Sequence, residues 1–265
     1  MKIKMDFKQL WMGAFLSLPF VSIGQNAGYS LNKVHSHNDY WQSRPFYLAY
    51  EHGLGSVEAD TYLWDGALLV AHDTVALKKE NTLQHLYLEP LKAALLSHGG
   101  HPFADTSLHI QLLIELKTEA DTEIKAMETA LQQYPEITDN PQVQVVFTGN
   151  TPSVKAMLAC PTYMRFDGQL SHTYPPEALA HIAMLSDNLQ DFITWDGKGK
   201  LTQKQEKVLR RWVKKGHDLG KKVRFWNAPD NPLAWETFMR LGVDYINTDH
   251  IEAVTQFFEK LNQKQ

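Results

Sequence analysis

The sequence predicts a single-domain α/β fold, a (β/α)8 TIM barrel in which eight parallel strands are surrounded by helices. Three observations predict it. Strand-like and helix-like segments alternate along the chain, and this alternation favours a parallel sheet. Eight such units fit within 265 residues, and barrels of this kind typically have about 250. Polar side chains gather where the strands end, on the face where such barrels build their active sites.

The first 24 residues are typical of a secretory signal peptide. Three lysines precede the apolar run 10–23, and Ser22 and Gly24 are the small residues of a signal-peptidase site. The run is short for a membrane span, and no later segment resembles one. We therefore expect an exported protein, periplasmic or secreted, with residues 25–265 as its single domain. An N-terminal anchor or an ordinary helix is the alternative.

Apolar spacing and turn residues define the expected elements of the first half. A helix should end at Gly53, because apolar residues recur at helical spacing before it and Pro45 stands near its start. Asp65-Gly66 indicates a hairpin turn, and Asn81 should cap a leucine-rich helix. The expected strands are 31–35, 56–60, 108–116 and 143–147, with a hairpin arm at 68–72, and the expected helices are 42–53, 82–96 and 121–133.

The second half continues the same alternation. One helix carries Val208, Leu209 and Trp212 on a single face, and another begins at Pro232. The expected strands are 163–166, 192–195, 222–226 and 243–247, and the expected helices are 151–158, 175–185, 202–215, 232–241 and 251–261. No change of composition divides residues 31–262, so a second domain is not expected.

Composition argues against several kinds of partner. Lys plus Arg number 26 against 30 Asp plus Glu, a net charge of -4, so nothing argues for a nucleic acid or an anionic membrane surface. A basic cluster at Lys214, Lys215, Lys221 and Lys222 is interpreted as a solvated helix end. Cys160 is the only cysteine, so the chain can form no internal disulfide. Oligomeric state is not indicated.

Two carboxylates stand two residues apart at the end of the second expected strand. Glu58 and Asp60 therefore point to the same side, and Glu115 ends the next barrel strand. Carboxylates held close together repel one another unless one is protonated or a cation joins them. Ligation by oxygen alone suits Ca²⁺ or Mg²⁺, so we expect one divalent cation of either kind. Two solvent-facing acids are the simpler alternative.

Two histidines at matching strand ends are candidates for acid–base chemistry. Imidazole titrates near neutrality, so His37 and His72 could take and give a proton within one catalytic cycle. His35 ends the same strand as His37, and the two-residue spacing places both on one side. A zinc site formed by His35, His37 and His72 is an alternative, although three nearby acids would be unusual beside it.

The polar strand ends form four motifs, which are His37-Asn38-Asp39-Tyr40, Glu58-Ala59-Asp60, His72-Asp73 and Glu115-Leu116-Lys117. Together they resemble the phospholipase-C-like phosphodiesterase superfamily, which holds glycerophosphodiester phosphodiesterases and phosphatidylinositol-specific phospholipases C. Trp226-Asn227 and residues 242–249 are similar to the end of the glycerophosphodiesterase pattern. The resemblance covers about residues 31–255 and is nearest to the altered inheritance of mitochondria type.

The resemblance implies a role for each matching residue. His37 and His72 would be general base and general acid. His35 is the alternative to His37 because both end the same strand, but Asn38-Asp39-Tyr40 after His37 favours His37. The metal ligands would be Glu58, Asp60, Glu115 and Asn38, and the substrate or phosphate contacts would be His35, Lys117, Arg165 and Trp226. The implied activity is that of a phosphoric diester hydrolase acting on a glycerophosphodiester or phosphoinositide-like substrate, either a small molecule or a lipid headgroup. The implied route uses the substrate's own neighbouring hydroxyl and passes through a cyclic phosphodiester, and direct attack by metal-bound water is the alternative.

Two departures from the family pattern leave the substrate open. Glycerophosphodiesterases usually have His-Arg-Gly at the first histidine and Pro-Glu-Asn-Thr soon after, whereas this chain has His37-Asn38-Asp39 and Arg44-Pro45-Phe46. The competing functions are a sphingomyelinase-D-like lyase and a non-catalytic module that binds phosphate ligands or cations. Glu115 in place of an aspartate argues against the first, and the presence of both histidines argues against the second.

Overall fold

The computed structural model describes residues 28–263. The predicted signal peptide, residues 1–24, lies outside the described residues. Within the described part of the chain, no helix is long and apolar enough to cross a membrane. These residues form a parallel barrel with helices around it, which confirms the predicted fold class.

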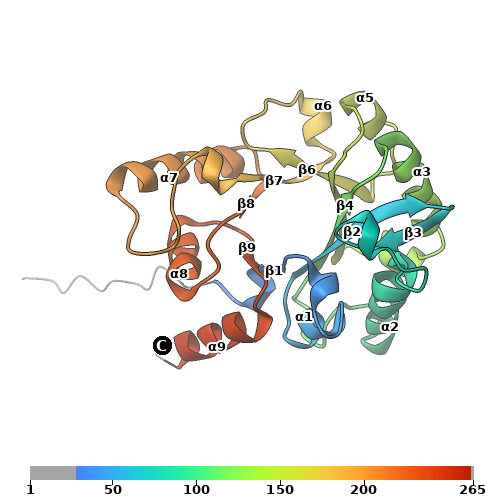
Figure 1. Ribbon diagram of the computed structural model, residues 1–265, viewed down its shortest axis with the longest axis horizontal. Coiled ribbons are helices and arrows are strands. Elements are labelled where there is room, and N and C mark those ends of the chain that lie inside the picture. Colours follow the sequence, from blue (N-terminus) through green and yellow to red (C-terminus); the bar gives the residue numbers. More distant parts are fainter. Residues whose placement is uncertain (1–27, 264–265) are drawn as a thin grey trace, which may run out of the picture.

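Eight parallel strands form an almost closed barrel (Figure 1). Their bounds are β1 Val34–Ser36, β2 Ser56–Trp64, β4 Ile110–Leu116, β5 Val143–Gly149, β6 Met164–Gln169, β7 Ile182–Asn188, β8 Lys222–Trp226 and β9 Ile246–Thr248. They run in the order β8-β7-β6-β5-β4-β2-β1-β9. The two ends of this order meet at an isolated parallel bridge between Arg224 and Tyr245, and the Asp244 amide donates to the Val223 carbonyl oxygen at 2.9 Å.

Helices surround the ring of strands in Figure 1. Their bounds are α1 Tyr47–Glu51, α2 Glu89–Ser97, α3 Ala120–Leu131, α4 Pro135–Thr138, α5 Val154–Met157, α6 Pro176–Leu179, α7 Gln203–Asp218, α8 Pro232–Leu241 and α9 Ile251–Asn262. α7 begins with a capping box between Thr202 and Gln205. α8 ends at Gly242, whose φ of 84° is the left-handed conformation that glycine adopts at helix ends.

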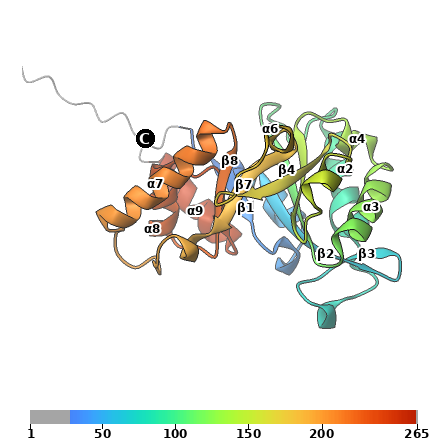
Figure 2. The ribbon, with the colours of Figure 1, turned by 90° about the horizontal axis from the view of Figure 1, so that it is seen from above.

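One hairpin extends outside the parallel barrel. β3 (Ala67–Val70) pairs antiparallel with the second half of β2, and Figure 2 shows the two strands at one side of the molecule. Asp65 and Gly66 form the turn with φ of 48° and 80°, as the Asp-Gly signal predicts. The Ala71 amide then donates to the Asp60 carbonyl oxygen at 3.1 Å. The hairpin therefore returns the chain to the rim of the barrel.

The prediction of a helix at 175–185 and a strand at 192–195 is wrong. A single turn of helix, α6, is followed directly by β7. The apolar start of β7 explains the error, because periodicity alone cannot assign a short apolar run to helix or strand. Ile193 and Trp195 are buried in the loop that follows β7, so their apolar character reflects packing and not a strand.

Several other expected elements are shorter than predicted. Leu31–Lys33 form a 3-10 turn, so β1 begins only after it. Of the helix expected at 42–53, only α1 is an α-helix. Within the helix expected at 82–96, a π-helical turn at Gln84–Leu88 precedes α2.

The interior of the barrel changes character along its axis. A small apolar cluster occupies the middle and consists of Leu113, Val146, Met184 and Tyr245. Two residues further along three of these strands stand the polar residues Glu115, Thr148 and Ser186. Because side chains two apart on a strand share a face, these residues also point inward. Polar side chains therefore gather inside the carboxyl end of the barrel.

Candidate active site

A buried carboxylate holds the loop that follows β1. Asp39 is fully buried. It accepts hydrogen bonds from the Ser36 hydroxyl at 2.7 Å, the Phe46 amide at 2.5 Å and the Tyr87 hydroxyl at 3.1 Å. Burial raises the pKa of Asp39 to about 6, although these hydrogen bonds oppose the rise. The contacts fix the loop that presents His37 at the carboxyl end of the barrel.

Three carboxylates from neighbouring strands converge at this end. Glu58 and Asp60 lie on β2, and Glu115 lies on β4 opposite Asp60 in the parallel register. One ligand oxygen from each lies within 4.8 Å of the others. Burial raises the pKa of Asp60 to about 7, and the charges of Glu115 and Glu58 contribute to the rise. The structure thus brings together the three acids that the sequence analysis expects to lie close to one another.

The acidic cluster has the chemistry of a site for a hard divalent cation. Asp60 Oδ1 is buried and has no hydrogen-bond partner within the described chain. Its other oxygen, Oδ2, accepts a hydrogen bond from the Tyr40 hydroxyl at 2.8 Å. The three grouped ligands are all carboxylate oxygens, which Ca²⁺ and Mg²⁺ prefer. The residues present therefore fit such an ion.

Lys117 and Asn38 lie at the edge of the acidic cluster. Lys117 Nζ is 2.8 Å from Asp60 Oδ2 and 2.8 Å from Glu115 Oε1. Burial lowers the pKa of Lys117, but the hydrogen bonds to these carboxylates outweigh it and raise the pKa overall, so the lysine is cationic. Asn38 Oδ1 accepts a hydrogen bond from the Tyr40 hydroxyl at 2.6 Å. Because Tyr40 also contacts Asp60, it links the asparagine to the acids.

His35 lies beneath the site with both ring nitrogens occupied. Its ring is fully buried. Nδ1 is 2.7 Å from Ser56 Oγ, and Nε2 is 2.7 Å from both Glu58 Oε2 and Arg224 Nη1. Burial and the charge of Arg224 lower the pKa of His35 to about 4, against the opposing effect of Glu58. The predicted phosphate contact of His35 is therefore wrong, because a neutral, enclosed ring can only position Glu58.

Arg224 is a central residue that the sequence reasoning missed. It is 3% exposed, on β8. Its Nη1 is 3.5 Å from Glu58 Oε2. Burial would raise the pKa of Glu58, but the hydrogen bond to His35 and the charge of Arg224 lower it to about 2. Glu58 is therefore ionised at neutral pH. The sequence does indicate that Arg224 faces the site, because it stands two residues before Trp226, the predicted pocket residue, and therefore shares its face of β8.

A second buried carboxylate lies on the other side of Arg224. Asp167 Oδ2 is 3.9 Å from Arg224 Nη2 and accepts a hydrogen bond from the Ser186 hydroxyl. Burial raises the pKa of Asp167 to about 6, although the charge of Arg224 opposes the rise. Arg224 therefore lies between Glu58 of β2 and Asp167 of β6.

His37 lies at the end of β1, where an aspartate orients its ring. His37 Nδ1 is 2.8 Å from Asp249 Oδ1. Burial lowers the pKa of His37, but the hydrogen bond to Asp249 and the charge of Glu58 outweigh it and raise the pKa overall. Because Nδ1 is engaged by Asp249, Nε2 is the ring nitrogen that could exchange a proton with a substrate.

His72 stands outside the cavity that His37 lines. Its side chain is exposed, and its ring packs on Trp41 with centroids 5.1 Å apart. His35, His37 and His72 therefore do not converge, which contradicts the zinc alternative. Within residues 28–263, the His, Cys, Asp or Glu side chains that lie close enough together to share a metal ion are the three acids.

A cavity of about 470 Å³ adjoins the acids. His37, Glu58, Glu115 and Arg224 line it, and so does Trp226, the residue predicted to form a pocket wall. The opposite wall comes from β6, β7 and the loop between them, and it includes Asp167, Gln169, His172, Tyr174, Ser186 and Asp187. The sequence analysis did not assign this wall to the site, because it expected residues 175–185 to form a helix.

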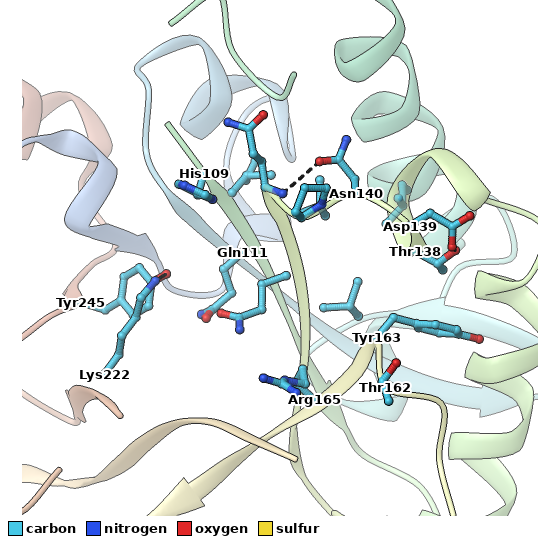
Figure 3. A pocket seen from close by; sticks show the side chains of 17 residues that line it. His109, Gln111, Thr138, Asp139, Asn140, Thr162, Tyr163, Arg165, Lys222 and Tyr245 are labelled. Atoms are coloured by element: carbon cyan, nitrogen blue, oxygen red, sulfur yellow. Dashed lines mark hydrogen bonds between the residues drawn. The ribbon is translucent and has the colours of Figure 1, made fainter. Parts of the chain in front are cut away.

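Arg165 lies at the opposite end of the barrel. It is the second residue of β6, and its Nη1 donates to the Ala180 carbonyl oxygen at 2.8 Å. Figure 3 shows it in a different cavity, which Lys222 also lines. The predicted contact of Arg165 with a substrate phosphate in the catalytic cavity is therefore wrong. β6 extends to Gln169, so Asp167 and not Arg165 reaches the carboxyl end.

Two family models match the chain. Residues 28–164 match the AIM6-like phosphodiesterase domain, and residues 222–252 match the glycerophosphoryl diester phosphodiesterase family. The altered inheritance of mitochondria protein 6 homolog of Arthroderma benhamiae is 31% identical, over 85% of this chain and 83% of that protein. Altered inheritance of mitochondria protein 6 of Eremothecium gossypii is 27% identical, over 86% of this chain and 69% of that protein.

A solved structure shares the fold. A glycerophosphodiester phosphodiesterase from Parabacteroides distasonis superposes with a TM-score of 0.53 at 20% sequence identity. The match covers 87% of this chain and 98% of that one. At this identity the likeness concerns the barrel and not the details of the site.

Proposed function

Because the chain belongs to the AIM6-like phosphodiesterase domain family, we propose that it cleaves a phosphodiester by metal-assisted acid–base catalysis at the carboxyl end of its barrel. One observation carries this proposal. Glu58 and Glu115, two of the three grouped carboxylates that fit a divalent cation, line one cavity together with the aspartate-oriented His37.

Glu58, Asp60 and Glu115 would hold the cation, with Asn38 at its edge. When bound, a divalent cation neutralises phosphate oxygens and stabilises the charge that develops in the transition state. The unpartnered Asp60 Oδ1 supports this assignment. Arg224 and His35 keep Glu58 ionised and oriented, and Lys117 adds a second positive charge beside the phosphate position.

His37 would act as the general base. Asp249 binds Nδ1, so Nε2 accepts the proton of a hydroxyl group next to the substrate phosphoester. The oxygen of that hydroxyl attacks phosphorus, and the bond from phosphorus to the leaving alcohol breaks. The immediate product is a cyclic phosphodiester. Substrates of this class are glycerophosphodiesters and phosphoinositide-like headgroups, because both carry such a hydroxyl.

His72 would protonate the leaving alcohol. It directly follows Ala71, whose amide donates to the Asp60 carbonyl oxygen at 3.1 Å, so the backbone that carries His72 lies at the rim of the barrel near Asp60. Its packing on Trp41 orients the ring. Protonation of the leaving oxygen matters most when the alcohol is a poor leaving group.

A panel of phosphodiesters tests the function. The wild-type chain should cleave at least one natural glycerophosphodiester and at least one phosphoinositide headgroup, both of which carry the hydroxyl that the mechanism needs, and EDTA should abolish these activities. Restoring Ca²⁺ or Mg²⁺ should recover them. Bound phosphodiester without turnover, with the metal present, would instead favour a non-catalytic binding module.

We also propose that the protein is exported. Cleavage after Gly24 would leave a mature chain that begins at Gln25. Intact mass of the protein recovered from its native host measures this directly. A mature form that retains Met1 would contradict export through a cleaved signal peptide.

A further inference from the structure

A second cavity of about 450 Å³ opens at the amino end of the barrel (Figure 3). It shares no lining residue with the catalytic cavity. The buried side chains of Leu113, Val146 and Met184 lie between the two. A volume of several hundred cubic ångströms is typical of small-molecule sites.

The charge of this cavity favours an anion. Arg165 and Lys222 both line it, and among its described lining residues Asp139 is the only acid. Figure 3 shows Asp139 beside Thr138, away from Arg165. The Arg165 guanidinium is held in the wall by its bond to the Ala180 carbonyl oxygen. Cations fixed in a concave site attract anionic ligands.

The register of the strands explains why both cations point into the barrel. Arg165 pairs with Val146, and Lys222 pairs with Met184. Both partners belong to the apolar cluster inside the barrel, and paired residues on parallel neighbours share a face. In Figure 3, Lys222 lies beside Tyr245, and its Nζ donates to the Tyr245 hydroxyl oxygen at 2.8 Å.

A buried amide supplies a contact of the opposite kind. Gln111 lines the cavity and is 1% exposed. Its Nε2 donates to Ser56 Oγ at 3.0 Å, while its Oε1 is buried without a partner in the described chain. A buried acceptor left unpaired is costly. A ligand hydroxyl that donates to Gln111 Oε1 would remove this penalty.

We propose that the amino-end cavity binds a phosphorylated polyol, with its phosphate at Arg165 and Lys222 and a hydroxyl donating to Gln111 Oε1. The phosphate supplies the anionic oxygens that two cations bind. The polyol supplies the hydroxyl donor and fills a space larger than a phosphate ion needs. The site is separate from the catalytic cavity and does not depend on the proposed catalysis.

Amide NMR shifts of the full chain test the proposal, because they distinguish ligands at the two ends of the barrel. The probes are glycerol 3-phosphate, methyl phosphate (which has the charge but no hydroxyl) and inorganic phosphate. Glycerol 3-phosphate should give saturable shifts at Gln111 and Thr162, with a dissociation constant about tenfold lower than that of either other probe.

Two variants separate the contacts. Arg165→Gln should weaken the binding of glycerol 3-phosphate and of methyl phosphate by about tenfold each. Gln111→Met should reduce the affinity for glycerol 3-phosphate to the affinity for methyl phosphate. If Gln111→Met does not fold, the comparison of these two probes in the wild type tests the same contact. Arg211→Gln, which changes an exposed arginine on α7, is the matched control and should bind like the wild type.

Three results would overturn the proposal. The first is shifts confined to catalytic-end amides such as Thr148 and Gly149. The second is binding that Arg165→Gln leaves unchanged. The third is equal affinity for glycerol 3-phosphate and either methyl or inorganic phosphate, because the hydroxyl contact and the polyol assignment would then have no support.

Discussion

At the carboxyl end of the barrel, carboxylates face one another, whereas at the amino end Arg165 and Lys222 line a cavity together with a buried amide. The same strands build both ends. β6 carries Arg165 at one end and Asp167 at the other, and β4 carries Gln111 and Glu115. The comparison shows that strand direction and a two-residue period are enough to separate two polar sites of different chemistry within one barrel.

The two ends also differ in what they lack. Close carboxylates repel one another, so a bound cation would stabilise the carboxyl end beyond what Lys117 and Arg224 contribute. The amino end holds cationic side chains and an unpartnered acceptor, so the proposed ligand there would supply an anion and a hydrogen-bond donor. The following experiments break or sharpen this contrast, from the largest expected effect to the smallest.

The largest effect is expected from His37→Ala. Removing a positioned proton acceptor costs about 10²–10⁴-fold in rate, so kcat on a good substrate should fall by that factor while the fold is retained. The kcat of His72→Ala should fall by a similar factor on a substrate with a poor leaving group, and it should recover on a substrate with a good leaving group. Steady-state kinetics of both variants on the two substrates measure this. A His37→Ala enzyme of near wild-type activity would contradict its role.

Arg224→Met should cause the largest loss of stability. Removing one member of a buried ion pair costs about 3–5 kcal/mol, because the remaining charges stay buried and unpaired. Glu58 and Asp167 would be those charges. Urea unfolding should show this loss, whereas Arg211→Met on exposed α7 should stay within about 0.5 kcal/mol of the wild type. A loss of stability for Arg224→Met as small as that of the control would mean that Arg224 does not pair with Glu58 and Asp167.

The stability of the metal-free chain should depend on pH through Asp60. Its pKa is raised from 3.8 to about 7 in the folded state, so the folded chain holds a proton that the unfolded chain releases. The stability that this proton contributes is present below pH 4 and is lost as pH rises through about 7. Thermal unfolding in EDTA should show this loss in the wild type.

Asp60→Asn is the matched variant for this prediction, because it keeps the shape and removes the titration. Its thermal stability in EDTA should fall less than that of the wild type over the same pH range. Parallel curves for the two proteins would mean that Asp60 does not carry a raised pKa.

The smallest effect is expected from Arg165→Gln on catalysis. Arg165 lies at the amino end, and distant sites act independently. We therefore expect kcat and KM for phosphodiesters within about twofold of the wild type. Trp226→Ala, which changes a lining residue of the catalytic cavity, should raise KM in the same assay. A loss of activity in Arg165→Gln as large as that in Trp226→Ala would mean that the two ends of the barrel do not act independently.

Much of this organisation is predictable from the sequence. The alternation of elements predicts the barrel, and the same-side spacing of Glu58 and Asp60 predicts their convergence with Glu115. The Asp-Gly turn predicts the hairpin that leads to His72. These features depend on local spacing and on the rule that parallel strands end on one face.

Other features depend on the register of the strands and on how deeply a side chain is buried. Local sequence patterns encode neither of these. Arg165 and Asp167 are two residues apart on one strand, and only the point where β6 begins and ends decides which of them reaches the site. His35 and His37 share a face, but only the packing shows that His35 is enclosed. The apolar start of β7 is compatible with helix or strand, and its neighbours in the sheet decide between them.

Calorimetric titration of the EDTA-treated chain with Ca²⁺ and Mg²⁺ tests the central claim most directly, namely that the three converging carboxylates form one metal site. We predict one ion bound per chain for at least one of the two metals, with binding lost in Asp60→Asn. Asp187→Asn, which removes a carboxylate that lines the adjoining cavity, should bind like the wild type. Absence of binding to the wild type, or equal binding to Asp60→Asn, would contradict the claim.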